Sequence, residues 1–295
     1  MREKIKTVLC VCLIMIGMPL IITVVFQGES LWSDRSLSTE QENGQQETDE
    51  ELLAVFVGIL AQEIPADYER EAIKAQAVIV RTNYEYALQT GAKPQEGLSV
   101  SEQRELFGRD NYTRYSQLLM DCLQETAGEV ISYGGQTVEA PFFPVSAGWT
   151  RQGESPYLKS VESPQDITSE NFLRVEFYTP EEFAAACNQS FPDAALTTEN
   201  LMKQIEITDR ETSGYVRTMR LGNASISGEE LRNALGLPSA HFYIRQIDDN
   251  IRIVIKGMGH GLGLSVYGAN ELAKQGMNYQ EILKNYYTGI EIQSN

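Results

Sequence analysis

The 295-residue sequence has little of what metal centres and nucleic-acid surfaces require. Its two histidines are His241 and His260, and its four cysteines form no Cys-x-x-Cys pair, so a structural zinc site lacks ligands. Basic residues are also scarce, because 24 of them stand against 41 acidic residues and give a net charge of −17. A chain this acidic repels phosphate backbones at long range. The sequence therefore predicts neither a metal cofactor nor a nucleic-acid partner.

A long apolar run lies near the N-terminus. Residues 8–26 are mostly apolar and follow a basic tip over residues 1–7, and as a helix they would reach about 28 Å. This pattern predicts a cytoplasmic tip (1–7) and a transmembrane anchor (8–26) in the cell membrane, with the rest of the chain extracytoplasmic. A cleaved signal peptide is the alternative, although the run exceeds the usual length and no small-x-small site directly follows it.

The next segment, residues 27–48, is rich in Ser, Glu, Gln and Asn and has no apolar periodicity. Such a composition predicts a flexible acidic linker, followed by a folded domain over residues 49–295. Cys10 and Cys12 fall in the apolar run. Cys122 and Cys187 remain, and in an oxidising compartment they either pair or stay as two buried free thiols.

The folded part mixes helical and strand patterns and predicts an α+β fold. A first helix is expected to end near Glu63, because Pro65 pushes Ile64 out of helical geometry, and a second to run from Tyr68 to Leu88 behind a cap at Asp67. Residues 162–249 either belong to the same compact domain or form a smaller lobe. Further helices are expected at 181–188, 229–235, 266–274 and 279–287, and strands at 130–133, 138–143, 172–178, 204–209, 215–221, 242–247 and 251–255.

Glu63 is a candidate general acid. It lies between apolar Leu60 and Ile64 at a helix end, where burial and the helix dipole disfavour a charged carboxylate. A carboxyl group held partly protonated can donate a proton to a leaving group. The alternative is an exposed helix-terminal glutamate.

Two further segments are candidates for ligand binding. The glycine segment, residues 257–263, alternates glycine with Met258, His260 and Leu262, which allows close backbone approach and leaves His260 open to a ligand. A structural turn is the alternative. The second segment contains Ser146, but Pro144 stands where a nucleophile elbow requires glycine. Ser146 is therefore expected to hydrogen-bond a ligand or a turn.

Five separated blocks occur in order between Leu52 and Ile292: GILAQEIPADYEREAIKAQAVIVRTNYEYAL, GEVISYGGQTVEAPFFPVSAGWT, SPYLKSV, ISGEELRNALGL and GMGHGLGLSVYGANELAKQGMNYQEILKNYY. Together they resemble the stage II sporulation protein D family, which has an N-terminal membrane anchor. The resemblance implies a peptidoglycan lytic transglycosylase that cleaves glycan strands between N-acetylmuramic acid and N-acetylglucosamine to 1,6-anhydro products. It also implies partners, namely a membrane-bound cell-wall amidase and other proteins of sporulation engulfment.

The resemblance also implies the site residues. The family's Ala-Glu-Met-Pro-like motif falls on residues 62–65, which makes Glu63 the catalytic residue. Substrate-binding positions are implied at Lys74, Gln76, Arg81, Ser146, His260, Ser265 and Tyr267. The sequence departs from the family at Ala147, where glycine is common, and at Val266, where Gln is common. Some members carry a Cys/His zinc cluster, but residues 99–107 hold neither residue type, so no metal is expected.

Two other function classes stay open: a noncatalytic amidase enhancer and a glycan-binding module of the same domain family. Ordinary glycosidases need two carboxyl groups. In a lytic transglycosylase the C6 hydroxyl of muramic acid attacks internally, so one glutamate can serve first as acid and then as base. A single candidate glutamate at residue 63 therefore favours the transglycosylase.

Overall fold

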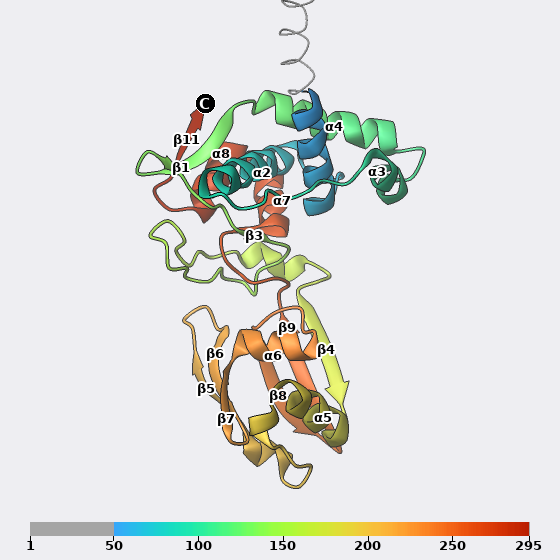
Figure 1. The fold of residues 1–295 in the computed structure, drawn as a ribbon, viewed down its shortest axis with the longest axis vertical. Helices are drawn as coiled ribbons and strands as arrows, with labels where there is room; N and C mark the ends of the chain where they lie inside the picture. The colour runs from blue at the N-terminus through green and yellow to red at the C-terminus, as the bar shows by residue number, and fades with distance from the viewer. Residues whose placement is uncertain (1–49, 295) are drawn as a thin grey trace, which may run out of the picture. The chain divides into compact units, whose positions relative to one another are not determined.

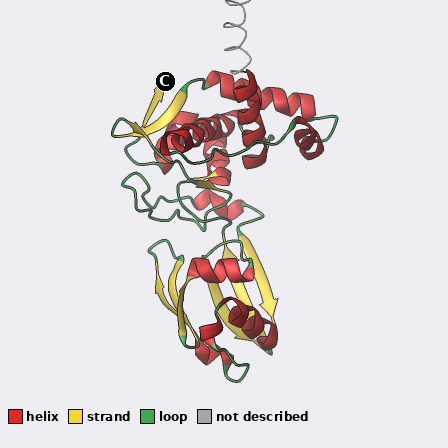
Figure 2. Cartoon of the chain, viewed as in Figure 1, coloured by secondary structure: helices red, strands yellow, loops and turns green. Residues whose placement is uncertain are grey.

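The computed structural model describes residues 50–294, and from Val55 onward they form one compact unit. The predicted cytoplasmic tip (1–7), anchor (8–26) and linker (27–48) lie outside the described residues. Within residues 50–294, no helix combines the length and apolar character that crossing a bilayer requires. Figure 1 shows the elements in their order along the chain, and Figure 2 distinguishes a mainly helical part from a part dominated by strands. The predicted α+β fold is confirmed.

The helical part is built around α2 (Arg70–Thr90). This helix packs against α4, α7, α8 and β1, and its middle, including Ile73, Val78 and Ile79, has no exposed surface. Residues 75–82 are buried on every side of the helix, and a helix that is buried all round lies in a core. The surrounding elements are α3 (Val100–Phe107), α4 (Tyr112–Glu125), α7 (Val266–Lys274), α8 (Tyr279–Tyr286) and a three-stranded antiparallel sheet of β11 (Glu291–Ser294), β1 (Glu129–Tyr133) and β2 (Gln136–Thr137).

The two ends of α2 differ in how well they were predicted. Gly91 ends the helix in the left-handed region at φ 73°, as its place just beyond the apolar pattern indicates. The expected cap at Asp67 is wrong, because the helix begins at Arg70 with Glu69 at the N-cap and no side-chain cap. Instead, the Glu69 backbone N–H donates to Asn270 Oδ1 at 2.8 Å. A tertiary contact from α7 thus satisfies this end.

The strand-rich part contains two three-stranded antiparallel sheets and two helices. One hydrophobic cluster joins them, with Phe183, Leu231, Phe242 and Ile253 fully buried. The chain between β4 and β9 thus has a hydrophobic cluster of its own. The sheets are β4 (Leu173–Tyr178), β9 (Asn250–Lys256), β8 (Phe242–Ile247) and β5 (Ile205–Arg210), β6 (Val216–Leu221), β7 (Ala224–Ser227), with helices α5 (Pro180–Ser190) and α6 (Gly228–Leu235) and 3-10 turns at Pro164–Thr168, Pro192–Ala194 and Leu201–Gln204.

Several elements differ from the sequence prediction. Helices α3 and α4 and strands β7 and β11 were not expected. The expected strand at 138–143 is wrong in extent, because β2 ends at Thr137 and β3 (Phe142–Phe143) pairs in parallel with β10 (Leu264–Ser265).

Cys122 and Cys187 are buried free thiols, and burial raises their pKa values to about 11 and about 12.

Candidate active site

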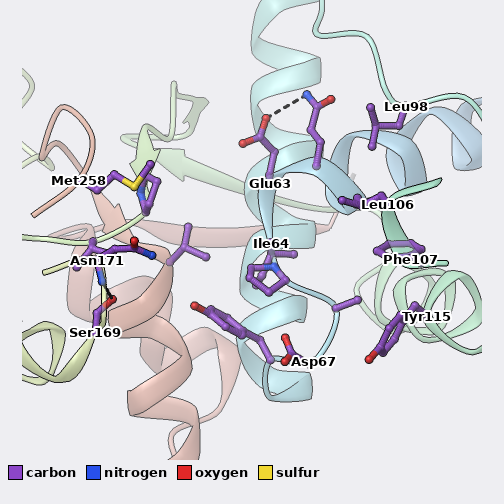
Figure 3. A pocket seen from close by; sticks show the side chains of 18 residues that line it. Glu63, Ile64, Asp67, Leu98, Leu106, Phe107, Tyr115, Ser169, Asn171 and Met258 are labelled. Atoms are coloured by element: carbon purple, nitrogen blue, oxygen red, sulfur yellow. Dashed lines mark hydrogen bonds between the residues drawn. The ribbon is translucent and has the colours of Figure 1, made fainter. Parts of the chain in front are cut away.

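A cleft of about 640 Å³ opens around the end of the helix that carries Glu63 (Figure 3). Apolar and aromatic side chains line it on the side of α3 and α4, and loops that precede β4 and α7 line it on the other side. A concave site with mostly apolar walls and a few polar groups is typical of small-molecule and sugar recognition. The lining residues are Ala61, Gln62, Glu63, Ile64, Pro65, Ala66, Asp67, Tyr68, Leu98, Leu106, Phe107, Tyr115, Pro144, Val145, Ser169, Asn171, Met258 and Val266.

Glu63 lies at the last helical residue before the break, as predicted. Its flanking residues Leu60 and Ile64 are buried, whereas Glu63 itself is half-buried and faces the cleft. Its Oε1 accepts hydrogen bonds from the side-chain amides of Gln62 at 3.2 Å and Gln95 at 2.5 Å. These two donors fix one oxygen of the carboxyl group, and among residues 50–294 no hydrogen bond involves the other oxygen. The carboxyl is therefore oriented and accessible.

Gln95 reaches Glu63 because an extended segment, residues 92–99, runs against the first helix. Gly58 and Gly97 make this approach possible. A Cβ on Gly97 would lie 2.4 Å from the Val55 carbonyl oxygen, and one on Gly58 would lie 2.5 Å from the Leu98 carbonyl oxygen. Side chains at either position would push the two backbones apart. The same segment carries Leu98 into the cleft wall.

The opposite wall is formed by the segments around Val145 and Met258. The Val145 and Met258 backbones form a short antiparallel bridge, with N···O distances of 3.1 and 2.7 Å. Gly257 allows this contact at φ 74°, since a Cβ there would lie 2.8 Å from the Val145 carbonyl oxygen. Met258 is 42% exposed and offers its side chain to the cleft. Of the glycine segment, only Met258 is among the lining residues.

A buried carboxyl group, Asp166, lies behind this wall. It is 0% exposed, and its two oxygens accept hydrogen bonds from Ser146 N and Ser265 Oγ, each at 3.0 Å. Burial raises the pKa of Asp166 above its usual range, against the opposing effect of these hydrogen bonds. Asp166 thus ties the loop at Ser146 to the start of α7. Sequence reasoning missed it, because a single Asp in the stretch 163–168 carries no motif.

Three of the implied substrate-binding residues lie on α2, away from the cleft lining. Lys74 pairs with Glu71 and Glu125, each at 2.8 Å. Arg81 is 7% exposed and donates to the carbonyl oxygens of residues 123, 126 and 129, and burial lowers its pKa. Gln76 is fully buried, and its side-chain amide has no hydrogen-bond partner within the described part of the chain. Lys74 and Arg81 thus hold α2 against α4 and the start of β1.

The other four implied residues lie next to cleft residues rather than among them. Ser265 caps α7 by accepting from Gly268 N at 3.2 Å, and the Tyr267 hydroxyl lies 3.0 Å from that of Thr168. Ser146 accepts from Gly148 N at 3.1 Å. His260 is half-buried, accepts from Leu262 N at 3.1 Å through Nδ1, and has a pKa lowered by burial. Val145, Met258 and Val266, which are close to them in sequence, line the cleft. The structure therefore brings these segments to the cleft, but not the four side chains themselves.

The cleft also contains polar groups that sequence reasoning did not single out. Asp67, expected as a helix cap, lines the cleft instead, and so do Ser169 and Asn171. Tyr68 also lines the cleft, and burial raises its pKa to about 12. The only sequence signal for Asp67 and Tyr68 was their closeness to the helix break. Across residues 50–294, no group of His, Cys, Asp and Glu side chains could hold a metal ion.

Comparisons with known proteins identify the chain's relatives. A family model described as SpoIID, stage II sporulation protein, matches residues 43–133, which include the helix break and all of α2. Stage II sporulation protein D of Bacillus amyloliquefaciens is 32% identical over 256 residues, covering 80% of this chain and 72% of the relative. The protein of the same name from Bacillus subtilis is 30% identical over the same shares. An amidase enhancer of Bacillus subtilis is 24% identical and is covered over 40% of its length.

The described residues thus form an α+β domain with a cleft in which one glutamate, Glu63, is oriented at a helix break. The match to the Bacillus amyloliquefaciens protein covers 80% of this chain and is thus longer than the match of the family model to residues 43–133. The chain belongs to the stage II sporulation protein D family, a family of sporulation proteins.

Proposed function

We propose that the chain is a peptidoglycan lytic transglycosylase that cleaves glycan strands to 1,6-anhydro products, with Glu63 as its acid and base. The observation that carries this proposal is the position of Glu63, a half-buried carboxyl held by Gln62 and Gln95 within an open cleft of apolar and aromatic walls. Tyr115 and Phe107 offer ring faces of the kind that pack against the apolar faces of sugars.

The reaction needs one group that first gives and then takes a proton. In the first step the Glu63 carboxyl donates its proton to the glycosidic oxygen as the bond to the muramic acid C1 breaks. In the second step the resulting carboxylate accepts the proton of the C6 hydroxyl, whose oxygen bonds to C1 and closes the anhydro ring. The nucleophile belongs to the substrate, so its effective concentration is high and no water has to be positioned. The amides of Gln62 and Gln95 hold the carboxyl through both steps.

The test is product analysis on glycan strands stripped of peptides. Wild type is expected to release 1,6-anhydromuramic ends, identified by mass spectrometry. Glu63→Gln keeps the shape and removes the titrating proton, so turnover should fall by roughly 10²-fold or more. Glu96→Gln is a matched control, since Glu96 is 78% exposed and pairs with Lys93. Unchanged turnover in Glu63→Gln with a normal melting temperature would refute the assignment.

A noncatalytic amidase enhancer is the second candidate, favoured by the 24% identity to a protein of that name. It predicts that the Glu63→Gln protein stimulates a purified cell-wall amidase as well as wild type does, with no anhydro product from either. A glycan-binding module predicts neither product nor stimulation. The proposed setting is the same for all three: a chain anchored by residues 8–26, with the cleft outside the membrane beside an amidase and engulfment proteins.

A further inference from the structure

The sheet β4-β9-β8 has one buried and one exposed face (Figure 1). Phe242, Ile251, Ile253 and Ile255 are on the buried face and contribute to the hydrophobic cluster. Successive side chains of a strand point to opposite faces, so the alternate positions form the outer face. The outer-face residues are Leu173, Val175, Phe177, Tyr243, Arg245, Ile247, Arg252, Val254 and Lys256.

Two arginines lie directly opposite one another on this face. The register pairs Arg245 with Arg252 across β8 and β9, and Arg252 with Phe177 across β9 and β4. Like charges in directly opposed positions destabilise a sheet. Among the ion pairs of residues 50–294, none involves Arg245, Arg252 or Lys256. The outer face carries no Asp or Glu, in a chain whose net charge is −17.

Apolar and aromatic side chains surround the two arginines. Phe177 is 59% exposed, Leu173 55%, Ile247 42% and Tyr243 40%. Tyr243, Arg245, Arg252 and Val254 line a hollow of about 280 Å³, and the Arg210 guanidinium stacks over the Tyr243 ring at 4.4 Å. Exposed apolar patches with embedded arginine and tyrosine have the composition of protein interfaces.

We propose that this outer face is a docking surface for a protein partner that presents carboxylate side chains to Arg245 and Arg252 and apolar side chains to Phe177 and Tyr243. Charge complementarity selects an acidic partner, because a carboxylate between the two guanidinium groups relieves their repulsion and accepts paired hydrogen bonds. The apolar surroundings select a protein over an anionic polymer, since a hydrated polyphosphate chain has no apolar surface to cover Leu173, Phe177 and Ile247. The surface is independent of the chemistry at Glu63.

The test uses the full chain and three synthetic probes, measured by fluorescence anisotropy at low ionic strength. The probes are a copolymer of Glu and Tyr, polyglutamate and inorganic polyphosphate. The copolymer is expected to bind most tightly, and Arg245→Gln/Arg252→Gln to weaken it by about tenfold or more. Phe177→Ser is expected to weaken the copolymer and leave polyglutamate unchanged.

Arg174→Gln/Arg217→Gln is the control, matched in charge. These arginines are 63% and 58% exposed, lie off the outer face and pair with Glu176 and Asp209. Their double variant should change binding by less than about twofold, because exposed ion pairs contribute little. The proposal is overturned if the copolymer fails to bind, if both double variants weaken it equally, if polyphosphate binds more tightly, or if Phe177→Ser has no effect.

Discussion

Two carboxyl groups, Glu63 and Asp67, face the same cleft, and the proposed mechanism uses only one. A two-carboxyl glycosidase would use the second to activate water or to attack the sugar. We therefore expect Asp67→Asn to retain the anhydro product and to lose less than about tenfold in turnover, against roughly 10²-fold for Glu63→Gln. Mass spectrometry of the products decides the question. Reducing ends from wild type, together with an inactive Asp67→Asn, would establish hydrolysis instead.

Arg81 is a structural residue in this fold, since its guanidinium donates to three backbone carbonyls at 2.6, 3.0 and 3.1 Å. Arg81→Met removes the charged donor from all three carbonyls, although Thr126 O still accepts from Glu129 N at 3.1 Å, so the free energy of unfolding should fall by about 1.5–3 kcal/mol. Turnover per folded molecule should not change.

Urea denaturation checks the expected loss of stability, with Arg70→Met as the control. Arg70 pairs with Glu125 at the surface, where such a pair contributes about 1 kcal/mol or less. A stable but inactive Arg81→Met protein would show instead that Arg81 takes part in substrate binding.

At the scale of elements, the Gly58–Gly97 crossing controls the position of Gln95. Gly97→Ala places a methyl group 2.4 Å from the Val55 carbonyl oxygen, so the segment has to move and the hydrogen bond from Gln95 to Glu63 is strained. We expect a lower melting temperature and a loss of turnover that exceeds the loss of folded protein. Glu96→Ala changes the neighbouring exposed residue and should leave both unchanged. Normal turnover in Gly97→Ala would show that Gln95 is dispensable.

Local signals predicted most of these elements. Strand β8 and helix α7 have the predicted bounds, because a segment rich in aromatic residues and isoleucine specifies the strand and a helical apolar pattern specifies the helix. Helices α3 and α4 were missed. In α3 the apolar residues Val100 and Leu106 are exposed and Gln103 is buried, so its sequence carries no pattern of a buried apolar face. The start of α2 was misplaced because Asn270, two hundred residues away, replaces the local cap.

The site was predictable to a similar degree. The helix end at Glu63 could be predicted because apolar flanks and a proline coincide within the six residues 60–65, whereas its catalytic role stays a prediction. The far wall could not, because Met258 and Val145 meet through a backbone bridge that no local pattern encodes. Asp166 could not be predicted for the same reason, because its hydrogen-bond partners Ser146 and Ser265 are distant from it in sequence.

For the whole molecule, the two histidines predict a loss of stability in acid. Burial lowers the pKa of His241 to about 4 and also lowers that of His260. Between pH 4 and 6.5 the unfolded chain binds protons that the folded chain does not, so the free energy of unfolding rises with pH across this window.

Urea denaturation at pH 4.5 and pH 7 should therefore show a smaller difference for His241→Asn than for wild type. The variant removes the titrating group and keeps a polar side chain beside Tyr215 and Tyr243. An equal difference in both proteins would mean that His241 is protonated as easily when folded as when unfolded.

The bridge between Val145 and Met258 has a consequence for how the protein folds. The strands that contribute to the hydrophobic cluster of the strand-rich part all lie between these two residues in the chain. Gly257 N donates to Phe172 O where the chain leaves this part. The contact is of high sequence separation, and such contacts form late because chain entropy is lost before they are gained. A nascent chain can form the helix of Glu63 and α2 early. The cleft wall opposite α3 and α4 is completed later, when the segment of Met258 pairs with that of Val145. An unfinished or truncated molecule therefore carries the carboxyl group without the enclosure that makes it a binding site.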